Sequence, residues 1–410
     1  MLRLINTLSN FMRLYVGLFA IAIFIVLIDF IFYKLFLRKS LNRKRYQRVL
    51  IPMSLSYLLF WAFLFIYSPK TYSYLEEDNY SQFFIATSIF IVWYLPRLVA
   101  ILIKLLFIIP DALKITKSRI TSIIALSTGA LLLIGGITGI FINRFQFRII
   151  EENIVSSSVP KSFNNYKVVQ ISDLHLGTAK SQKERYNKMV DMINNQNPDM
   201  VVFTGDIVNN FATELEGWQP ILSQINAKDG VFAVLGNHDY GDYVKWETPQ
   251  DKQRNNLDIV DFFEKVGWKL LRNEYDTLIK NSDTIIISGV ENWGHPPFPQ
   301  YGDLKASTPI NSDLPIILLS HDPSHWDGEV KDYPADIFLT LSGHTHGFQF
   351  GIRSKNINIS PVTMRYEKWG GLYQENNKQL YVNIGAGTIG FPGRIGMRPE
   401  ITVLTLKTVD

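Results

Sequence analysis

The 410-residue chain contains no cysteine, which excludes a disulfide framework and any metal site with thiolate ligands. Cysteine usage therefore gives no guide to the cellular compartment. Charged residues make up only 19% of the chain, and the formal net charge is +4. Much of this small excess lies in short segments beside apolar stretches, so it does not indicate a nucleic-acid partner. The sequence also has no internal repeat, which excludes a repeat architecture.

The composition divides the chain into an apolar part, residues 1–145, and a part of mixed composition, residues 146–410. A membrane core of ~30 Å needs about 20 apolar residues in a helix. The first predicted span lacks a small-residue cleavage site, so we expect it to remain as an anchor. Pro96 and Lys104 interrupt the third predicted span. In an alternative interpretation this span ends near Pro96, and an interfacial helix follows it. Four stretches predict a multi-pass α-helical membrane region: Leu14–Tyr33, Leu50–Tyr67, Phe83–Ile109 and Ile120–Ile142.

The loops between these stretches predict the orientation in the cell membrane, because basic loops usually stay in the cytoplasm. The loop between the second and third stretches has only Lys70. The region after Ile142 is therefore expected on the outer face, either periplasmic or extracellular. Arg144 and Arg148 act against this orientation. The basic residues that favour it lie after the first stretch and before the fourth: Arg38, Lys39, Arg43, Lys44, Arg45, Arg48, Lys114, Lys117 and Arg119.

Beyond Lys167 the sequence alternates between strand-like and helix-like segments. Apolar runs such as Met200–Phe203 are typical of strands that are covered on both faces. The pattern predicts an α/β fold, a layered α/β/β/α sandwich. The predicted strands are 167–172, 200–204, 231–235, 284–290, 315–320, 337–340, 379–384 and 401–406, and the predicted helices are 184–195, 213–225 and 257–266.

Five polar clusters follow predicted strands, at the edge where open α/β sheets usually bind ligands. In extended backbone, residues two positions apart point to the same side, so two ligands of one cluster can bind one ion. Their carboxylate, amide and imidazole groups suffice for two divalent ions, and favour Mn, Fe or Zn over Ca. Two divalent ions bring more positive charge than the cluster carboxylates offset, and the remaining positive charge suits an anionic phosphate. The clusters are Asp173-Leu174-His175, Gly205-Asp206, Gly236-Asn237-His238-Asp239, His321-Asp322 and Gly343-His344-Thr345-His346.

The order of these clusters resembles that of the calcineurin-like metallophosphoesterase superfamily over residues 165–407. Finer features resemble its membrane-associated YkuE/YaeI-like bacterial branch. Phe348 departs from that branch, which often has a second glycine there, and the departure concerns the pocket wall, not the ligands. The motifs that carry the finer resemblance are Ser172–Gly177, Gly343–Gly347 followed by Gln349, Gly385–Thr388 and Arg398–Ile401.

The resemblance implies roles for most of the polar residues in these clusters. His238 would donate a hydrogen bond or a proton toward the phosphate or the leaving group, and Asp239 would orient the His238 ring. A hydroxide bridging two ions ~3.5–4 Å apart would attack the phosphorus. Asp206 would bridge the ions, of which the first would be held by Asp173, His175, Asp206 and His346, and the second by Asp206, Asn237, His321 and His344.

Several polar residues outside the clusters leave alternatives open. His295 either contacts substrate or belongs to a rigid surface loop, and Arg394 either clamps a phosphate or lies on a solvated basic face. His325 is expected to be a solvated surface residue. Asp29, near the end of the first predicted span, is either functional or solvated at the membrane interface.

These features predict a membrane enzyme whose C-terminal domain is a metal-dependent phosphoesterase. Its expected partners are the lipid bilayer and a phosphoester substrate, with no nucleic acid. Proximity to the bilayer favours a lipid-linked or headgroup phosphoester, while a soluble nucleotide or cyclic nucleotide remains open. A catalytically silent binding or scaffold protein is the alternative from another class, although silent proteins usually lose ligands and every expected position is filled. The native metal and self-association remain open.

Overall fold

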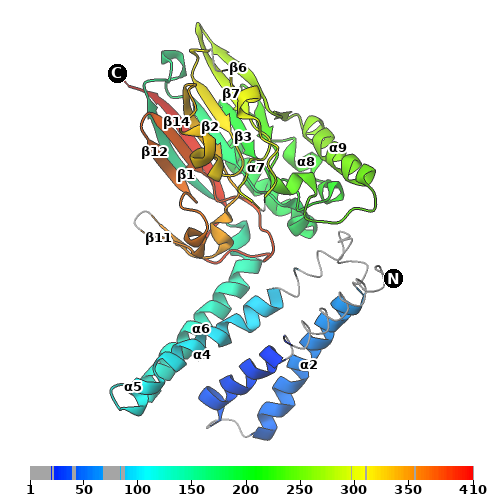
Figure 1. Ribbon diagram of the computed structural model, residues 1–410, viewed down its shortest axis with the longest axis vertical. Helices are drawn as coiled ribbons and strands as arrows, with labels where there is room; N and C mark the ends of the chain where they lie inside the picture. The colour runs from blue at the N-terminus through cyan, green and yellow to red at the C-terminus, as the bar shows by residue number, and fades with distance from the viewer. Residues whose placement is uncertain are drawn as a thin grey trace. The chain divides into compact units, whose positions relative to one another are not determined.

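The computed structural model of the chain describes residues 20, 23–38, 43–67, 84, 88–296, 298–309, 312–354 and 357–409. The chain forms two compact units, Met1–Thr138 and Gly139–Asp410. The first contains helices and the second contains sheets with covering helices (Figure 1).

The first unit consists of helices in the part that the structure describes. Two of the described helices, Ser88–Leu106 and Ser118–Phe145, are long and apolar enough to cross a membrane. The third predicted stretch is therefore helical before and after Pro96, which lies in the first turn of α4, where a missing N–H is tolerated. The helical elements are the π-helix η1 (Tyr33–Leu37), α2 (Arg43–Tyr67), α4 (Leu95–Leu106), α5 (Ile108–Ala112) and α6 (Ser118–Phe141).

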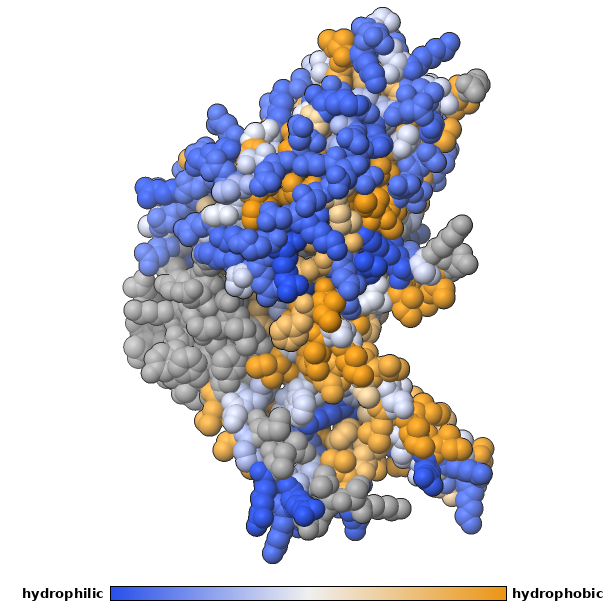
Figure 2. Space-filling model, turned by 180° about the vertical axis from the view of Figure 1, so that it is seen from behind, coloured by the Kyte–Doolittle hydropathy of each residue, from blue (hydrophilic) through white to orange (hydrophobic). Residues whose placement is uncertain are grey.

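The other two predicted spans are less completely described. Leu14–Tyr33 lies partly outside the described residues, and Leu50–Tyr67 falls in α2, where many side chains lie outside the description. The four-span membrane region therefore stays a prediction. Over the described helices of this unit, hydrophobic side chains gather at the surface, as Figure 2 shows.

Polar residues inside this unit bind one another. Asp29 is buried, and its carboxylate accepts a hydrogen bond from the Arg97 guanidinium at 2.6 Å and another from the Ser54 hydroxyl. Lys104 donates to Asp111 and to the Thr121 hydroxyl, each at 2.6 Å. Of the two alternatives for Asp29, interfacial solvation is therefore excluded, because the charge is paired between helices.

The second unit contains two six-stranded sheets and a separate two-stranded hairpin. In the first sheet, β14 is antiparallel to β2, and the other neighbours are parallel. Its order is β1 (Arg148–Ser156), β14 (Glu400–Thr408), β2 (Lys167–Ile171), β3 (Met200–Thr204), β4 (Val231–Val234) and β5 (Lys269–Leu270).

In the second sheet the inner pairs are parallel and the two outermost pairs are antiparallel. The hairpin pairs β10 (Ile352–Arg353) with β11 (Asn358–Ile359). The order of the second sheet is β12 (Gly371–Glu375), β13 (Lys378–Val382), β9 (Ile337–Ser342), β8 (Ile316–Leu319), β7 (Asp283–Gly289) and β6 (Glu274–Lys280).

Side chains of the two sheets pack together in a buried core, and each sheet is covered on its outer face. In β3, Met200 and Val202 belong to the core between the sheets, whereas Val201 and Phe203 pack under the helices of the first sheet. The first sheet is covered by α7 (Asn187–Asn194), α8 (Gln219–Leu222) and α9 (Pro249–Lys265). The second sheet is covered by α10 (Leu304–Ser307) and the π-helix η7 (Trp326–Val330). The mixed α/β architecture is the predicted one.

Short 3₁₀ turns occupy many of the connections between these elements. They are η2 (Asn143–Phe145), η3 (Lys161–Phe163), η4 (Leu176–Tyr186), η5 (Ala212–Leu215), η6 (Asn237–Tyr240), η8 (His346–Gln349) and η9 (Pro361–Met364). Because β2, β3 and β4 are parallel neighbours, and β8 and β9 are parallel neighbours in the facing sheet, the polar clusters that follow these five strands meet at one edge of the sandwich.

Candidate metal centre

The loops that leave these strands have an unusual backbone. Asp173, His175, Asp206, His344 and His346 all have positive φ, between 43° and 72°. This left-handed region is disfavoured for residues with a side chain, although Asp and His visit it more often than most. Such conformations persist where the surrounding structure holds them, and they gather at functional sites.

Two glycines allow these loops to approach one another. A Cβ atom on Gly236 would lie 2.2 Å from the Asp206 Oδ1 atom. One on Gly343 would lie 1.9 Å from the Ser172 Oγ atom and 2.4 Å from the Asp173 Oδ2 atom. No side chain fits at such distances, so glycine is required where the loops meet.

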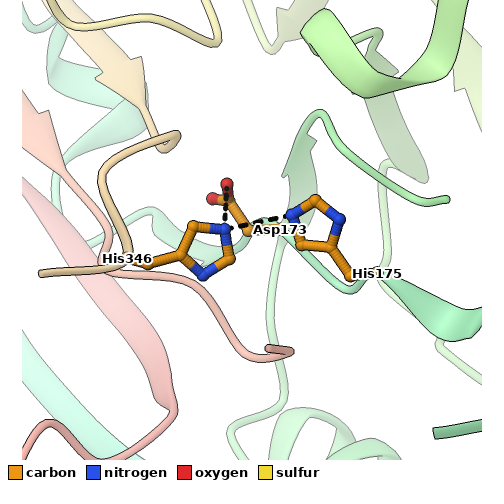
Figure 3. A group of neighbouring side chains, drawn as sticks. All are labelled: Asp173, His175 and His346. Carbon is orange, nitrogen blue, oxygen red and sulfur yellow. Dashed lines mark hydrogen bonds and ion pairs between the residues drawn. The ribbon is translucent and has the colours of Figure 1, made fainter. Parts of the chain in front are cut away.

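Figure 3 shows the first of two groups of possible ligands, Asp173, His175 and His346. The Nε2 atoms of the two histidines are 3.0 Å apart, and His346 Nε2 lies 3.2 Å from the Asp173 Oδ1 atom. All three side chains are buried. Asp173 is further held by the backbone N–H of His344, which donates to both carboxylate oxygens at 3.0 Å.

The second group contains Asp206, His321 and His344, with Asn237 beside them. His321 Nε2 lies 3.2 Å from the Asp206 Oδ2 atom and 3.1 Å from the Asn237 Oδ1 atom. His344 Nδ1 is 2.8 Å from the same Asn237 oxygen. The Asn237 amide nitrogen donates to the Tyr243 hydroxyl at 2.8 Å, which turns its oxygen toward the histidines.

Asp206 links the two groups. Its Oδ2 atom lies 3.2 Å from His321 Nε2 and 3.6 Å from His175 Nε2. Its Oδ1 atom accepts the backbone N–H of His238 at 2.8 Å. One carboxylate therefore faces histidines of both groups, as a bridging ligand must.

In three histidines, the ring nitrogen that points away from the centre (the outer nitrogen) has a hydrogen-bond partner. The other ring nitrogen (the inner nitrogen) is therefore suited to bind a cation. His175 Nδ1 faces the Val208 carbonyl at 3.1 Å, and His321 Nδ1 faces the Thr204 carbonyl at 2.6 Å. His344 Nε2 lies 2.7 Å from the Tyr366 hydroxyl. When the outer nitrogen donates its proton in this way, the inner nitrogen carries a lone pair.

Such lone pairs repel one another unless a proton or a cation lies between them. The inner nitrogens of His321 and His344 are 3.2 Å apart, and the Asn237 oxygen lies against both. The buried side chains therefore fit two divalent cations. Imidazole, carboxylate and amide ligands without sulfur suit Mn, Fe or Zn.

The electrostatics of the centre agree with this assignment. Burial lowers the pKa of His175 and of His344, so these rings are neutral, the form that binds metal. Burial also acts to lower the pKa of His321, but the Asp206 carboxylate raises it to about 10. Burial opposes ionisation of Asp206, yet His321 and His238 hold the pKa of that carboxyl well below its usual range. A cation would replace the proton on His321.

The structure corrects the role expected for Asp239. The His238 Nδ1 atom faces the backbone carbonyl of Asn209 at 2.7 Å, so Asp239 does not orient the ring. Burial and the nearby Asp206 carboxylate raise the pKa of Asp239 to about 7, although the N–H groups of Gly236 and Val208 act in the opposite direction. Consecutive residues of a helical turn point in different directions, so neighbours in sequence need not bond each other. The Asp239 carboxylate instead accepts the backbone N–H groups of Asp206, Ile207, Val208 and Gly236, at 2.9, 2.9, 3.2 and 2.8 Å.

A cavity of about 420 Å³ opens over the ligands, and several of its residues carry no assignment from the sequence. Phe348, which departs from the resembling branch, is 51% exposed and forms part of the wall. Tyr366 also lines the cavity, and its hydroxyl contacts the candidate ligand His344. Arg365 adds a positive charge to the lining. The lining residues are Asp206, Asn237, His238, Phe298, His344, Thr345, His346, Phe348, Gln349, Arg365, Tyr366 and Ile389.

Two of the weaker candidates lie outside this lining. His295 is exposed, with its ring 5.5 Å from that of Trp293. Arg394 is fully buried behind the centre, where its guanidinium donates to the Gly387 carbonyl and lies 3.4 Å from His346 Nδ1. A solvated basic face is therefore excluded for Arg394, and its contacts support the ligand His346.

The expectation of a solvated His325 was wrong. Its ring is fully buried, stacks on Trp293 at 4.9 Å, and bonds the Ser320 hydroxyl at 2.9 Å. Asp322 belongs to the fourth polar cluster, and the sequence indicated no role for it. It is buried, with one carboxylate oxygen 3.6 Å from His344 Nε2, and its place directly after a ligand was the available signal.

The chain resembles proteins that share this arrangement of motifs. The model of the calcineurin-like phosphoesterase family matches residues 166–348. The chain is 32% identical over 295 residues to the uncharacterized metallophosphoesterase YkuE of Bacillus subtilis, and the match covers 70% of this chain and 95% of that protein.

Two further relatives have names that mention a diacylated UDP-sugar or a membrane. The UDP-2,3-diacylglucosamine pyrophosphatase LpxG of Chlamydia trachomatis is 29% identical over 300 residues, covering 61% of this chain and 88% of LpxG. A transmembrane protein with a metallophosphoesterase domain from Danio rerio is 29% identical over 272 residues. That match covers 63% of this chain and 57% of the fish protein.

Proposed function

This chain belongs to the calcineurin-like phosphoesterase family and is a metal-dependent phosphoester hydrolase, and we propose that it is a membrane-anchored enzyme acting on a lipid-linked or headgroup phosphoester. The observation that carries the proposal is the convergence of two buried ligand groups on one carboxylate, that of Asp206, below an open cavity.

We assign two ions to these groups. Two divalent cations held there would supply Lewis-acid chemistry and acidify a water near neutral pH, which is how such pairs promote hydrolysis. The buried carboxylates of Asp173 and Asp206 offset only part of their charge, so the centre favours a substrate that brings an anion. The first ion would be held by Asp173, His175, Asp206 and His346, and the second by Asp206, Asn237, His321 and His344.

His238 is the residue best placed to handle the leaving group. Its ring lines the cavity, 5.1 Å from the ring of His175. Nδ1 is bonded to the Asn209 carbonyl, which leaves Nε2 as the nitrogen that exchanges a proton with substrate. Arg365 lines the same cavity, where a guanidinium can pair with phosphate oxygens.

A lipid phosphoester is supported by three features taken together. Among the residues that the structure describes, two helices are long and apolar enough to cross a membrane. The cavity wall includes the apolar side chains of Phe298, Phe348 and Ile389. LpxG, a relative, is named as a pyrophosphatase of UDP-2,3-diacylglucosamine, a UDP-linked sugar that carries two acyl groups. We further propose the outer face of the membrane for the catalytic unit, from the basic loops of the first unit.

The decisive experiment purifies the full chain in detergent and assays it with and without Mn²⁺. The substrates are bis-p-nitrophenyl phosphate, UDP-2,3-diacylglucosamine and a set of nucleotides. We expect Mn²⁺-dependent hydrolysis, with the diacyl substrate preferred over soluble ones. Hydrolysis of nucleotides alone would remove the lipid part of the proposal.

The assignment of the bridge is tested by Asp206→Asn, because an amide cannot counter charge on two ions. We expect the variant to lose both ions, as measured by elemental analysis of Mn-loaded protein. Asp258→Asn, an exposed position of α9, is the matched control. Full metal occupancy in Asp206→Asn would refute the bridging role.

Protease treatment of intact spheroplasts tests the orientation, and complete protection of the catalytic unit would overturn the outward placement.

A further inference from the structure

Six apolar side chains stand in solvent around the β10–β11 hairpin, and we call them the hairpin patch. In Figure 2, hydrophobic residues gather at the right of the view, where this hairpin lies. An apolar patch of this kind on a soluble unit usually marks a surface that contacts a partner or a membrane. The patch consists of Phe348 (51% exposed), Phe350 (37%), Ile352 (57%), Ile357 (47%), Ile359 (64%) and Met364 (91%).

The hairpin is held in place so that its isoleucines face outward. Ile352 and Ile359 are directly opposite each other across the two strands, so both lie on one face. The next residue, Arg353, points to the other face, where its guanidinium donates to the buried Glu400 carboxylate at 2.6 Å. A two-stranded ribbon is barely stable alone in water. This ion pair therefore fixes a ribbon whose outer face has no cover among the residues that the structure describes.

The base of the hairpin is bonded to the end of a candidate membrane span. Gly351 donates its N–H to the Ile395 carbonyl at 2.9 Å, and the N–H of Arg394 donates to the Gly139 carbonyl at 3.2 Å. Gly139 belongs to the last turn of α6 and to the second unit. The following residues, Phe141 and Ile142, are 64% and 49% exposed.

This connection argues for a lipid surface rather than for another partner. The end of a span lies at the membrane interface, and the hairpin lies within two backbone hydrogen bonds of that end, inside one compact unit. Exposed Phe, Ile and Met side chains gain free energy when they enter the boundary between headgroups and acyl chains.

We propose that the hairpin patch rests in the lipid interface and holds the mouth of the catalytic cavity against the bilayer. Phe348 belongs to both the patch and the cavity wall, so the two are continuous. The inference rests on the proposed membrane anchoring. It deepens the proposed function, because a lipid phosphoester could then place its phosphate in the cavity while its acyl chains stay in the membrane.

The absence of cysteine from the chain makes a direct test simple, because a single introduced cysteine is the only labelling site. The variant Ile359→Cys is labelled with an environment-sensitive nitrobenzoxadiazole dye. The full chain is then reconstituted in vesicles of phosphatidylethanolamine and phosphatidylglycerol, with or without lipids that carry a doxyl quencher. We expect the dye at position 359 to lose much of its fluorescence when the quencher is present.

Ile279→Cys is the matched control. Ile279 is 74% exposed, lies in the β6–β7 hairpin, and also faces solvent from an antiparallel strand pair. Figure 1 shows β6 and β11 at opposite ends of the second unit. We expect no quenching at position 279. Equal quenching at both positions would overturn the inference, because it would show contact without regard to the patch.

A third label separates this inference from the membrane anchoring on which it rests. Ile137, in α6, is 45% exposed. Quenching at Ile137→Cys without quenching at Ile359→Cys would overturn the hairpin proposal and leave the anchor intact. Quenching at neither would overturn both. Disulfide cross-linking of two copies through Ile359→Cys, without quenching, would show that a second copy covers the patch and would also overturn the proposal.

A kinetic test follows the same logic. The double variant Ile352→Asn/Ile359→Asn should lower kcat/KM for UDP-2,3-diacylglucosamine in vesicles, relative to bis-p-nitrophenyl phosphate, by about tenfold. Ile279→Asn should leave this ratio unchanged. An unchanged ratio in the double variant would refute a role of the patch in access to lipid substrate. If neither substrate is hydrolysed by the wild-type chain, the proposed function fails, and the labelling experiment still decides the location of the hairpin.

Discussion

Replacement of Asp239 by Asn separates two roles for this acid. The carboxylate uses Oδ1 to accept the N–H groups of Ile207 and Val208, and Oδ2 to accept those of Asp206 and Gly236. Asparagine has one acceptor oxygen and one NH₂ group. In the variant Asp239→Asn, one pair of backbone donors would therefore face another donor.

The expected cost follows from these contacts. A buried donor left unpaired costs ~1–3 kcal/mol, so two of them cost about 2–6 kcal/mol. That is a large part of the ~5–15 kcal/mol that stabilises a typical domain. The same loop carries Asp206, which lies between the two ligand groups. We therefore expect a lower unfolding midpoint in urea together with loss of bound Mn.

The measurements are urea unfolding followed by tryptophan fluorescence, and elemental analysis of the Mn-loaded protein. Asp258→Asn is the control, since this residue is exposed on α9 and its replacement should change the free energy of unfolding by less than ~0.5 kcal/mol. A catalytic partner of His238 would behave differently. An Asp239→Asn variant with normal stability and full metal, but with low turnover, would refute the structural role and restore the role expected from the sequence.

Three further substitutions test other parts of the site. His238→Ala should lower turnover by ~10² or more while metal content stays intact, and unchanged turnover would remove His238 from the reaction. Tyr366→Phe removes the hydroxyl 2.7 Å from His344 Nε2 and should weaken Mn²⁺ binding by ~10-fold or more, with Tyr275→Phe as an exposed control. Burial lowers the pKa of His325, so the unfolded chain binds a proton that the folded chain excludes. The free energy of unfolding should therefore fall by up to ~1.4 kcal/mol per pH unit as the pH drops below about 6.5. His325→Gln should reduce this slope, as measured by urea midpoints at several pH values, and an unchanged slope would contradict the assignment.

The strands that could be predicted from the sequence are those buried on both faces. β3 was predicted at its observed ends because all five residues are buried and the first four are apolar. β1 was missed because it is an outer strand with exposed Glu151 and only two buried residues near its end. Its position depends on nine backbone pairings with β14, more than 240 residues away. No local pattern marks such a strand.

The single helix predicted over residues 213–225 is broken into two short helical pieces. Gly217, with φ of 73°, interrupts it, and only Ala212–Leu215 and Gln219–Leu222 are helical. Glu214 caps the start of the first piece. Its buried carboxylate accepts the N–H groups of Asn209, Asn210 and Phe211, which precede that piece.

The ligands of the centre could be predicted because each follows an apolar strand, but the side chains that hold those ligands could not. Three consecutive N–H groups, from Asp206 to Val208, bind Asp239, and the next three, from Asn209 to Phe211, bind Glu214. Two buried carboxylates thus order the whole segment after β3. The positive φ of Asp206 is disfavoured by itself, so it depends on these bonds. The position of Asp206 between the two groups is therefore set by two acids outside the candidate ligands, which the spacing of the motifs does not reveal.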